Sequence, residues 1–343
     1  MPALVPARKI DRDSMCLLME RSTGGSPLKK RREIEKVRKA YNRGELFIPQ
    51  NEPENQRWWR CEARFMLGDY SDWSGWEYRD EWAATLWHWR DTKPYPVPPW
   101  NGLQTEYLYV IGEQGIGDEV FFASCLPEAI KRAGRVVLEC SPRLESVFQR
   151  SFGVETIPSK IRDGKRHKRE LPAGVTAWVS LADLPRMFRL DLSMFHGKPY
   201  LKPDLEQVRR FDDYRGSVGV SWRGAQGQIP EIRELFHGPI SLQYDQAWDE
   251  ELAQPKDLDL RNDIEGILGL LANLDKVVTV STSVAHFAAA LGVNTHVIIA
   301  DPKTGARGGI FPFKWICRKT PGRTPWYSSA VVYENIEEYR RKA

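Results

Sequence analysis

Short apolar runs alternate with helical patterns through the middle of the chain. Residues 107–113 (YLYVIGE) and 135–140 (RVVLEC) are apolar runs of strand length, and residues 118–134 between them carry a helical spacing that closes on Gly134. Shorter runs of strand type follow at 154–158 and 176–185. Strand and helix alternating at this spacing predict a parallel sheet covered by helices.

A second alternation of the same kind begins near residue 216. Residues 216–222 (GSVGVSW) read as a strand, and residues 284–292 read as a short helix with Gly292 as its C-terminal cap. The other predicted elements are a helix at 263–275 and strands at 238–245, 256–260, 276–281 and 294–301. Two open α/β units in tandem are therefore expected. Ligands in such sheets bind outside the carboxyl ends of the strands, so two facing sheets would form a cleft.

The first part of the chain differs from these two units. It reads as helical, first basic and then aromatic, until the proline-dense stretch 93–102 (KPYPVPPWNG) ends any helix. We therefore expect a helical extension over residues 1–98, one Rossmann-like domain over 99–210 and a second over 211–343.

Composition adds limits on location and partners. The net charge is +4, no apolar run approaches a membrane span, and the five cysteines are dispersed, which favours a reducing, cytoplasmic protein. The N-terminus lacks the apolar core and small-residue site of a secretion signal. The basic run 29–43 is typical of a solvated helix face, and the alternative is a surface for a polyanion. Most of the 13 tryptophans precede residue 101, at a near-helical spacing that favours a packed core over a ligand platform.

The first glycine-rich loop, GEQGIGDEV, follows the strand at 107–113. Its glycines 112, 115 and 117 are spaced G-x-x-G-x-G rather than G-x-G-x-x-G, and Asp118 would place a carboxylate beside a bound pyrophosphate. Asp118 is better suited to cap the helix or to act as a general base. Glu139 lies 22 residues after Gly117, where a ribose-binding acid would stand, so a nicotinamide-dependent oxidoreductase is a second hypothesis.

The second loop is the better candidate for a phosphate. A buried-type strand runs into Ser281, Thr282 and Ser283, and a helix of small residues follows. Serine and threonine cap a helix without adding negative charge, so the first N–H groups stay open to an anion. His286 on the first turn could donate to the same anion. The alternative is a capped core helix with a packed histidine.

Several motifs together resemble a known family. They are LGDYSDWSGWEYRDEW, PPWNG, GEQGIGDEVFFASCLP, RVVLECSPRL, SLADLPRMF, PYLKPD, VGVSWRG, ISLQYD, STSVAHFAAALG and PWY, in this order over about residues 66–335. The chain resembles the GT-B glycosyltransferases of family 9, which are related to heptosyltransferases, in the form fused to tetratricopeptide repeats in bacterial proteins. The resemblance implies an α/β GT-B fold with two facing Rossmann-like domains and a helical N-terminal extension.

The resemblance also implies roles for individual residues. Asp118 would be the general base that deprotonates the acceptor hydroxyl, on a loop that includes Gln114, Gly115 and Gly117. The donor diphosphate would lie against the second domain. The residues expected to bind the donor are Ser281, Thr282, Ser283, His286, Arg223 as first cationic partner, Arg233 as second, and Gln243 through its backbone.

This chain departs from the family pattern at two places. Ser281 stands where the family usually has an aspartate that holds donor hydroxyls, and RGAQGQ replaces the usual G-N-x-x-H after the first strand of the second domain. Asp257 and Asp259 match a D-x-D metal motif, which we interpret as structural. We expect no metal, and no cofactor besides the nucleotide-sugar that serves as donor.

The sequence thus predicts a glycosyltransferase of hexosyl or heptosyl type, inverting and metal-independent. Its acceptor could be a glycan, a protein or modified DNA. The DNA alternative is motivated by the basic leader and its nearby tryptophans. An inactive GT-B scaffold and a nicotinamide-dependent oxidoreductase are the alternatives from other classes.

Overall fold

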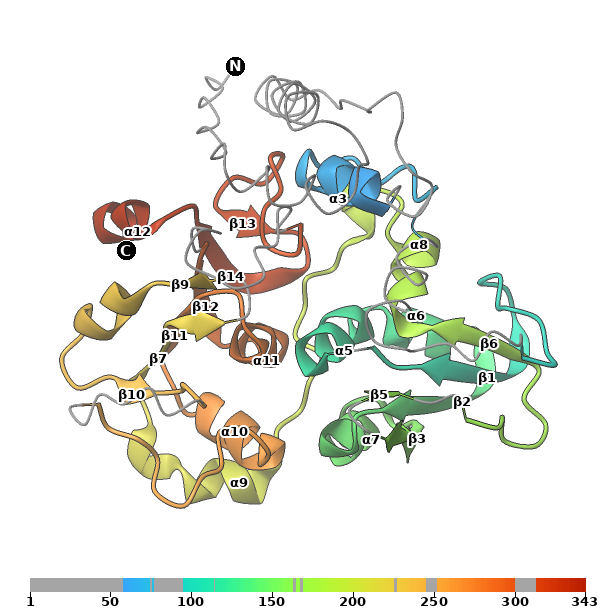
Figure 1. The fold of residues 1–343 in the computed structure, drawn as a ribbon, viewed down its shortest axis with the longest axis horizontal. Helices are drawn as coiled ribbons and strands as arrows, with labels where there is room; N and C mark the ends of the chain where they lie inside the picture. The colour runs from blue at the N-terminus through green and yellow to red at the C-terminus, as the bar shows by residue number, and fades with distance from the viewer. Residues whose placement is uncertain are drawn as a thin grey trace.

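A computed structural model describes most of the chain as two α/β units (Figure 1). The described residues are 58–74, 76, 95–113, 115–162, 165–166, 169–224, 227–244, 252–299 and 313–343. The basic run 29–43 and Gln114 lie outside them, and so does most of the predicted N-terminal extension. Within the described part, no helix is long and apolar enough to cross a membrane.

The first sheet has the order β3-β2-β1-β6, and its described strands are all parallel. Its strands are β1 (Thr105–Ile111), β2 (Ala133–Cys140), β3 (Glu155–Pro158) and β6 (Ala177–Ser180). The helices of this unit are α5 (Ile116–Ala123), α6 (Leu126–Ile130), α7 (Glu145–Phe152) and α8 (Pro185–Phe188). The chain leaves β1 towards β2 and β3 and later returns to its other side as β6. The strand order therefore reverses between β1 and β6, and ligands bind at such switch points.

The second sheet has the order β10-β7-β11-β12-β14-β13, parallel except for β13. Its strands are β7 (Val218–Ser221), β10 (Ile240–Ser241), β11 (Lys276–Thr279), β12 (Asn294–Ile298), β13 (Arg323–Thr324) and β14 (Tyr327–Tyr333). The helices of this unit are α9 (Leu205–Arg210), α10 (Ile264–Leu271), α11 (Ser283–Leu291) and α12 (Ile336–Lys342). Here the order reverses between β7 and β11, so this switch point lies beside the start of α11.

The other elements of the described residues are short. They are α3 (Trp58–Met66), the hairpins β4 (Ile161–Arg162) with β5 (Lys165–Arg166) and β8 (Arg223–Gly224) with β9 (Gly227–Gln228), and the 3-10 helices η2 (Pro142–Leu144), η3 (Leu181–Asp183), η4 (Leu192–Met194), η5 (Asp212–Tyr214) and η6 (Pro230–Glu234).

The predicted α/β fold with two Rossmann-like sheets is confirmed, and each predicted strand but one is present. The exception is 256–260, where the strand prediction is wrong. Asp257 has a positive φ of 60°, and the Asp259 carboxylate accepts hydrogen bonds from the backbone N–H groups of Arg261 and Asn262. These features make a turn, because a side chain that satisfies the backbone locally competes with strand pairing.

The single helix predicted over 118–134 is also wrong in its extent. The chain forms α5, turns at Ser124 and Cys125, and continues as α6 with Pro127 in its first turn. Proline has no N–H to give to a preceding carbonyl, so it is favoured at a helix start and interrupts a longer helix. Gly134 is not a helix cap; it lies in β2.

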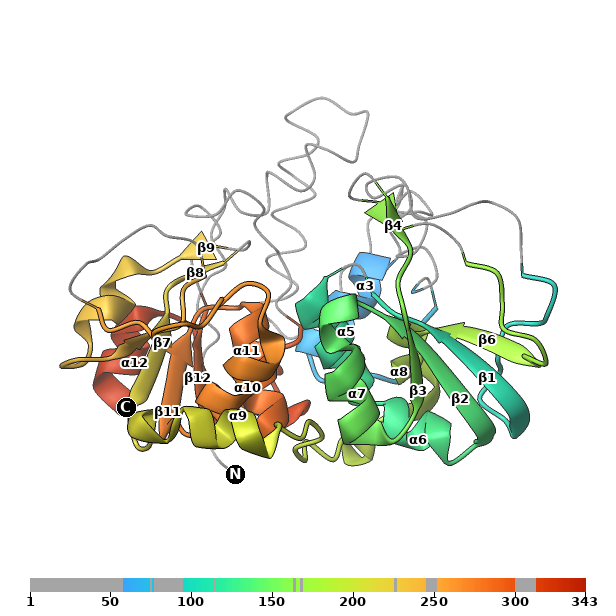
Figure 2. The ribbon, with the colours of Figure 1, turned by 90° about the horizontal axis from the view of Figure 1, so that it is seen from below.

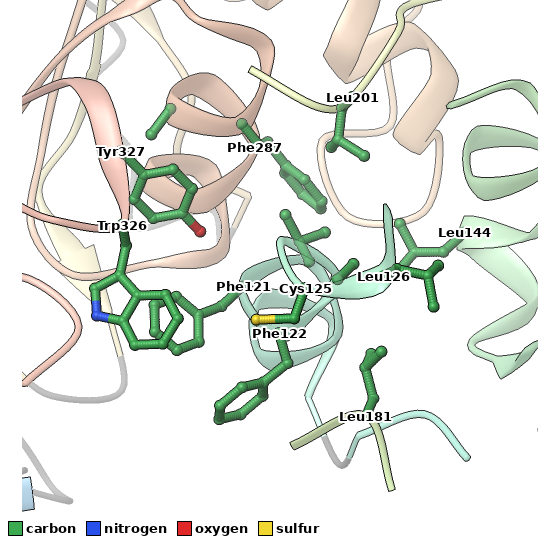
Figure 3. Packing of buried hydrophobic residues seen from close by; sticks show 14 of the residues in the cluster. Phe121, Phe122, Cys125, Leu126, Leu144, Leu181, Leu201, Phe287, Trp326 and Tyr327 are labelled. Atoms are coloured by element: carbon green, nitrogen blue, oxygen red, sulfur yellow. The ribbon is translucent and has the colours of Figure 1, made fainter. Parts of the chain in front are cut away.

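One hydrophobic core runs through both units. Phe121 and Phe122 on α5 belong to the same cluster of buried side chains as Phe287 on α11 and Trp326 beside β14 (Figure 3). Figure 2 shows α5 and α11 next to each other between the two sheets. The units are thus joined by packed side chains as well as by the chain itself.

The segment after α3 adds tryptophans to this core. Trp73 and Trp76 are buried, and their indole N–H groups donate to the carbonyls of Arg189 and Ala182 at 3.2 and 2.9 Å. The prediction that the tryptophan stripe forms a core is confirmed for these two residues. They lie in turns rather than on a helix, and Trp87 falls outside the described residues.

Candidate functional site

The two loops that the sequence singled out meet in the structure. A Cβ atom on Gly117, in the first turn of α5, would lie 3.3 Å from Cα of Ser283 and 3.3 Å from Cδ2 of His286. Ser283 is the first residue of α11, whose N-cap is Thr282. The helix that follows β1 and the helix that follows β11 therefore start side by side, and the absence of a side chain at Gly117 allows this contact.

Asp118 lies at the third position of α5. The N-cap is Gly115, which makes no side-chain cap bond, and a capping role for Asp118 stays a prediction. Its carboxylate accepts a hydrogen bond and ion pair from the ammonium of Lys314, in the second unit. The side chains of Asp118 and Lys314 remain 34% and 20% exposed, so a ligand can reach both.

Lys314 is a site residue that the sequence analysis missed. Its ammonium lies 4.9 Å from the centre of the Phe121 ring and 5.6 Å from that of Phe122, within the range of cation–π attraction. Its backbone carbonyl accepts from the hydroxyl of Thr324 at 2.7 Å. Lys314 is thus held both at its ammonium group and at its backbone.

The next residue, Trp315, attaches this segment to residues 281–283, called the donor loop after the role that the sequence predicts for them. The indole N–H of Trp315 donates to Oγ of Ser281 at 2.9 Å, and its ring stacks on His286 with 4.7 Å between centroids. Ser281, which replaces the aspartate of the family pattern, therefore anchors Trp315. This contact brings Lys314 to the start of α11.

The His286 ring is uncharged in this site at neutral pH. It is 5% exposed, and its Nδ1 is 3.0 Å from the Tyr327 hydroxyl. Burial, with a contribution from the nearby Lys314 charge, lowers the pKa of His286 to about 3. Positive charge for an anion must therefore come from other groups, and a contact between His286 and a phosphate stays a prediction.

The donor loop is ordered by its own hydroxyl groups. Thr282 caps α11 by accepting from the N–H of Ala285 at 3.4 Å, and its Oγ1 lies 3.2 Å from that of Thr279. Gly224 lies so close that an added Cβ would be 2.8 Å from the carbonyl oxygen of Ser281. This approach places its neighbour Arg223, in β8 just beyond the end of β7, beside the loop. The structure thus brings Arg223 together with residues 281–283.

Gln243 holds the backbone of Arg223 in place. Its Oε1 accepts from the backbone N–H groups of Trp222 and Arg223 at 3.2 and 3.1 Å, and its Nε2 donates to the Arg223 carbonyl at 3.2 Å. Arg233 packs over the ring of Trp222 at 5.5 Å and donates from Nε to the carbonyl of Pro230. Direct contacts of Gln243 or Arg233 with a donor remain predictions.

Two buried carboxylates lie near the carboxyl ends of the strands of the first sheet. Glu113 stands two residues after β1 and accepts from Oγ of Ser180, at the end of β6, at 3.4 Å. Glu119 accepts from the N–H of Ser141 at 2.9 Å, which ties α5 to the end of β2. Sequence analysis passed over both; Glu113 could have been noticed because it stands at the carboxyl end of a buried strand.

Glu139, the acid required by the oxidoreductase hypothesis, is buried at the carboxyl end of β2. It is 2% exposed and accepts a hydrogen bond from the hydroxyl of Tyr109 within the first unit. A carboxylate buried in this way is not accessible to a ribose. Among the described residues, no three or more His, Cys, Asp or Glu side chains are grouped so as to hold a metal ion.

Comparisons with known proteins found chains that are similar to this one. No family model matches. Protein FlbA of Caulobacter vibrioides is 27% identical over 304 residues, covering 76% of this chain and 48% of that protein. The chain thus spans about half the length of that relative.

Solved structures of glycosyltransferases are also similar to the chain. The ADP-heptose lipopolysaccharide heptosyltransferase II of E. coli is 15% identical with a TM-score of 0.42, over 66% of this chain and 89% of that one. A glycosyltransferase of family 9 from Veillonella parvula is 10% identical with a TM-score of 0.43, over 70% and 92%. Family 9 is the family that the sequence motifs resemble.

Proposed function

We propose that this chain is a glycosyltransferase that moves a sugar from a nucleotide-diphosphate sugar to an acceptor hydroxyl. The observation that carries the proposal is the contact of Gly117 with Ser283, because it places the carboxylate of Asp118 beside the loop suited to an anion. Support also comes from the ordered set of family motifs. We assign residues 99–210 to the acceptor side and 211–343 to the donor side.

In the reaction that we propose, Asp118 takes the proton of the acceptor hydroxyl as the bond to the anomeric carbon forms. The oxygen attacks from the face opposite the diphosphate, so the bond to the phosphate oxygen breaks and the configuration inverts. The electron pair of that bond leaves with the diphosphate. The resemblance implies that this chemistry needs no metal.

The donor loop would stabilise the charge that develops on the diphosphate. The first N–H groups of α11 point out of the helix start, and Thr282 and Ser283 add hydroxyl groups without a carboxylate. The helix dipole alone contributes only about 0.3–1 kcal/mol at such a position, so a cation is needed as well. Arg223, held by Gln243, is suited to that role.

Ligand binding tests the class of enzyme. UDP-, GDP-, ADP-, dTDP- and CMP-linked sugars and NAD and NADP are compared for their effect on the melting temperature of the protein. We expect a rise with one sugar nucleotide, since a ligand at a hundredfold excess over its Kd stabilises the folded state by about 2.7 kcal/mol. A rise with NAD alone, or with no sugar nucleotide, would contradict the proposal.

Turnover tests the role of Asp118. Release of the nucleoside diphosphate from the donor that binds, with water as acceptor, is measured for the wild type and Asp118→Asn. Loss of a general base costs about 10²–10⁴-fold in rate, while the melting-temperature shift with donor should persist. Asp213→Asn, at an exposed aspartate, is the matched control. Turnover unchanged in Asp118→Asn would remove the base assignment, and the absence of turnover in the wild type would favour an inactive scaffold.

A further inference from the structure

A carboxylate and a diphosphate would share the site that we propose, and the ammonium of Lys314 lies beside the carboxylate. Asp118 must be near the reacting carbon to take the hydroxyl proton, and the leaving diphosphate departs from that same carbon. Two anions so close repel each other unless a cation compensates them. The ammonium of Lys314 pairs with Asp118 and belongs to a segment fixed at the start of α11.

We propose that Lys314 is a catalytic residue that binds both anions, pairing with Asp118 and donating to the leaving diphosphate. This inference rests on the proposed function. An ammonium carries three N–H donors, so a bond to Asp118 leaves two for phosphate oxygens. Lys314 keeps its proton throughout, because the acceptor proton goes to Asp118 and the electron pair of the broken C–O bond goes to the diphosphate.

The fixed position of Lys314 favours this role over that of a mobile surface lysine. The rings of Phe121 and Phe122 lie under its ammonium, and Thr324 holds its backbone carbonyl. Its neighbour Trp315 is bonded to Ser281, one residue before the cap of α11. A charge that is positioned before the ligand arrives needs no reorganisation as the diphosphate leaves.

Two other polar side chains near the start of α11 are less suited than Lys314 to compensate both Asp118 and the diphosphate. His286 is buried, stacked on Trp315, and its lowered pKa of about 3 keeps it neutral. Arg223 reaches the donor loop through Gly224, from β8 just beyond the end of β7. Arg223 would therefore approach the diphosphate from the second sheet, whereas Lys314 would approach it from the side of Asp118, with which it pairs.

A double-mutant cycle separates direct binding from simple masking of Asp118. Affinities for UDP, GDP, ADP, CDP, dTDP and inorganic pyrophosphate are measured by calorimetry for the wild type, Lys314→Met, Asp118→Asn and the double variant. We expect Lys314→Met to weaken binding of the preferred diphosphate at least tenfold and Asp118→Asn to strengthen it. In the Asp118→Asn background, Lys314→Met should still weaken binding at least fivefold, because the cation itself is lost.

Controls keep the outcomes distinct. Lys319→Met changes an exposed lysine of the same segment and should leave affinity within twofold, while Lys314→Arg should restore part of it. Melting temperatures without ligand show whether each variant is folded. If Lys314→Met has no effect in the Asp118→Asn background, the lysine only masks the carboxylate and the inference is wrong. If the wild type binds none of the six probes, the proposed function fails and the inference fails with it.

Discussion

Gly117 and Ser283 touch across the two α/β units, and a side chain on Gly117 would require its neighbours to shift. An added Cβ would lie 3.3 Å from Cα of Ser283, which is backbone of the facing helix and cannot rotate away. The contact sets the separation between Asp118 and the donor loop. It therefore links a glycine with no chemistry of its own to the geometry of the reaction.

Replacing Gly117 by alanine should reduce turnover more than stability. Alanine is favoured over glycine inside a helix by about 0.5–1 kcal/mol, which offsets part of the strain of pushing α5 from α11. We expect a change in the free energy of unfolding below about 1 kcal/mol and a clear loss in the rate of donor hydrolysis. Gly117→Val should lose both. Urea denaturation and hydrolysis rates check this, and wild-type turnover in Gly117→Ala would show that the contact is not functional.

Removing the side chain of Gln243 should weaken both the protein and its affinity for a nucleoside diphosphate. Gln243→Ala leaves the buried N–H groups of Trp222 and Arg223 without their acceptor, at a cost of about 1–3 kcal/mol. Gln243→Glu should be worse, because a carboxylate oxygen would then face the carbonyl of Arg223. Gln149→Ala, which changes an exposed glutamine, is the control. Equal affinities of wild type and Gln243→Ala would show that Arg223 does not need this support.

His286 should make the folded protein sensitive to acid. Its pKa is about 3 when folded and 6.5 when free, so the unfolded chain binds more protons between these values. Stability is then complete above pH 6.5 and falls with decreasing pH by up to about 1.4 kcal/mol per unit until near pH 3. The slope of unfolding free energy against pH between 6.5 and 4.5 should flatten in His286→Gln.

A comparison of slopes isolates this effect from the packing lost in His286→Gln. His296, whose pKa is lowered to about 4 by burial, should keep part of the acid dependence in that variant. His196→Gln changes a histidine whose side chain is 64% exposed and should preserve the wild-type slope. A His286→Gln slope equal to that of the wild type would mean that His286 does not titrate on unfolding.

Trp76 should be among the costliest single side chains to remove. It packs against Phe65, Phe122 and Phe313, and its indole donates to the carbonyl of Ala182. Trp76→Ala should lower the free energy of unfolding by about 3–5 kcal/mol. Leu103→Ala, at an exposed leucine, should stay within about 0.5 kcal/mol. A loss below about 1 kcal/mol for Trp76→Ala, measured in urea, would show that this segment is not part of the cooperative core.

Most elements of the fold could be predicted from local sequence patterns. Buried strands such as β2 and β11 could be predicted because their apolar residues are consecutive in the sequence. The end of α11 could be predicted because the left-handed Gly292 follows it directly. The strand predicted at 256–260 failed because Leu258 and Leu260 imitate an alternating pattern. In the structure, the Asp259 carboxylate forms a turn with the following backbone N–H groups, and this turn replaces strand pairing.

The site was only half visible in the sequence, for a different reason. Asp118 and residues 281–283 stand in recognisable loops, each directly after a buried strand. Lys314 stands in a segment with no such signal, and its partner Asp118 is 196 positions away. An ion pair of this kind is specified by tertiary packing, in this case by Trp315 and Phe121, so no local pattern announces it.

Because one hydrophobic core runs between the two sheets, neither half of this protein can be exchanged without exposing part of that core. A fragment that ends near residue 210 would present Phe121 and Phe122 to water, and its counterpart would present Phe287 and Trp326. Exposed aromatic patches of this kind drive association, so each fragment made alone should aggregate. We therefore expect that a change in the proposed donor preference requires substitutions in the loops at the start of α11 rather than exchange of a whole half.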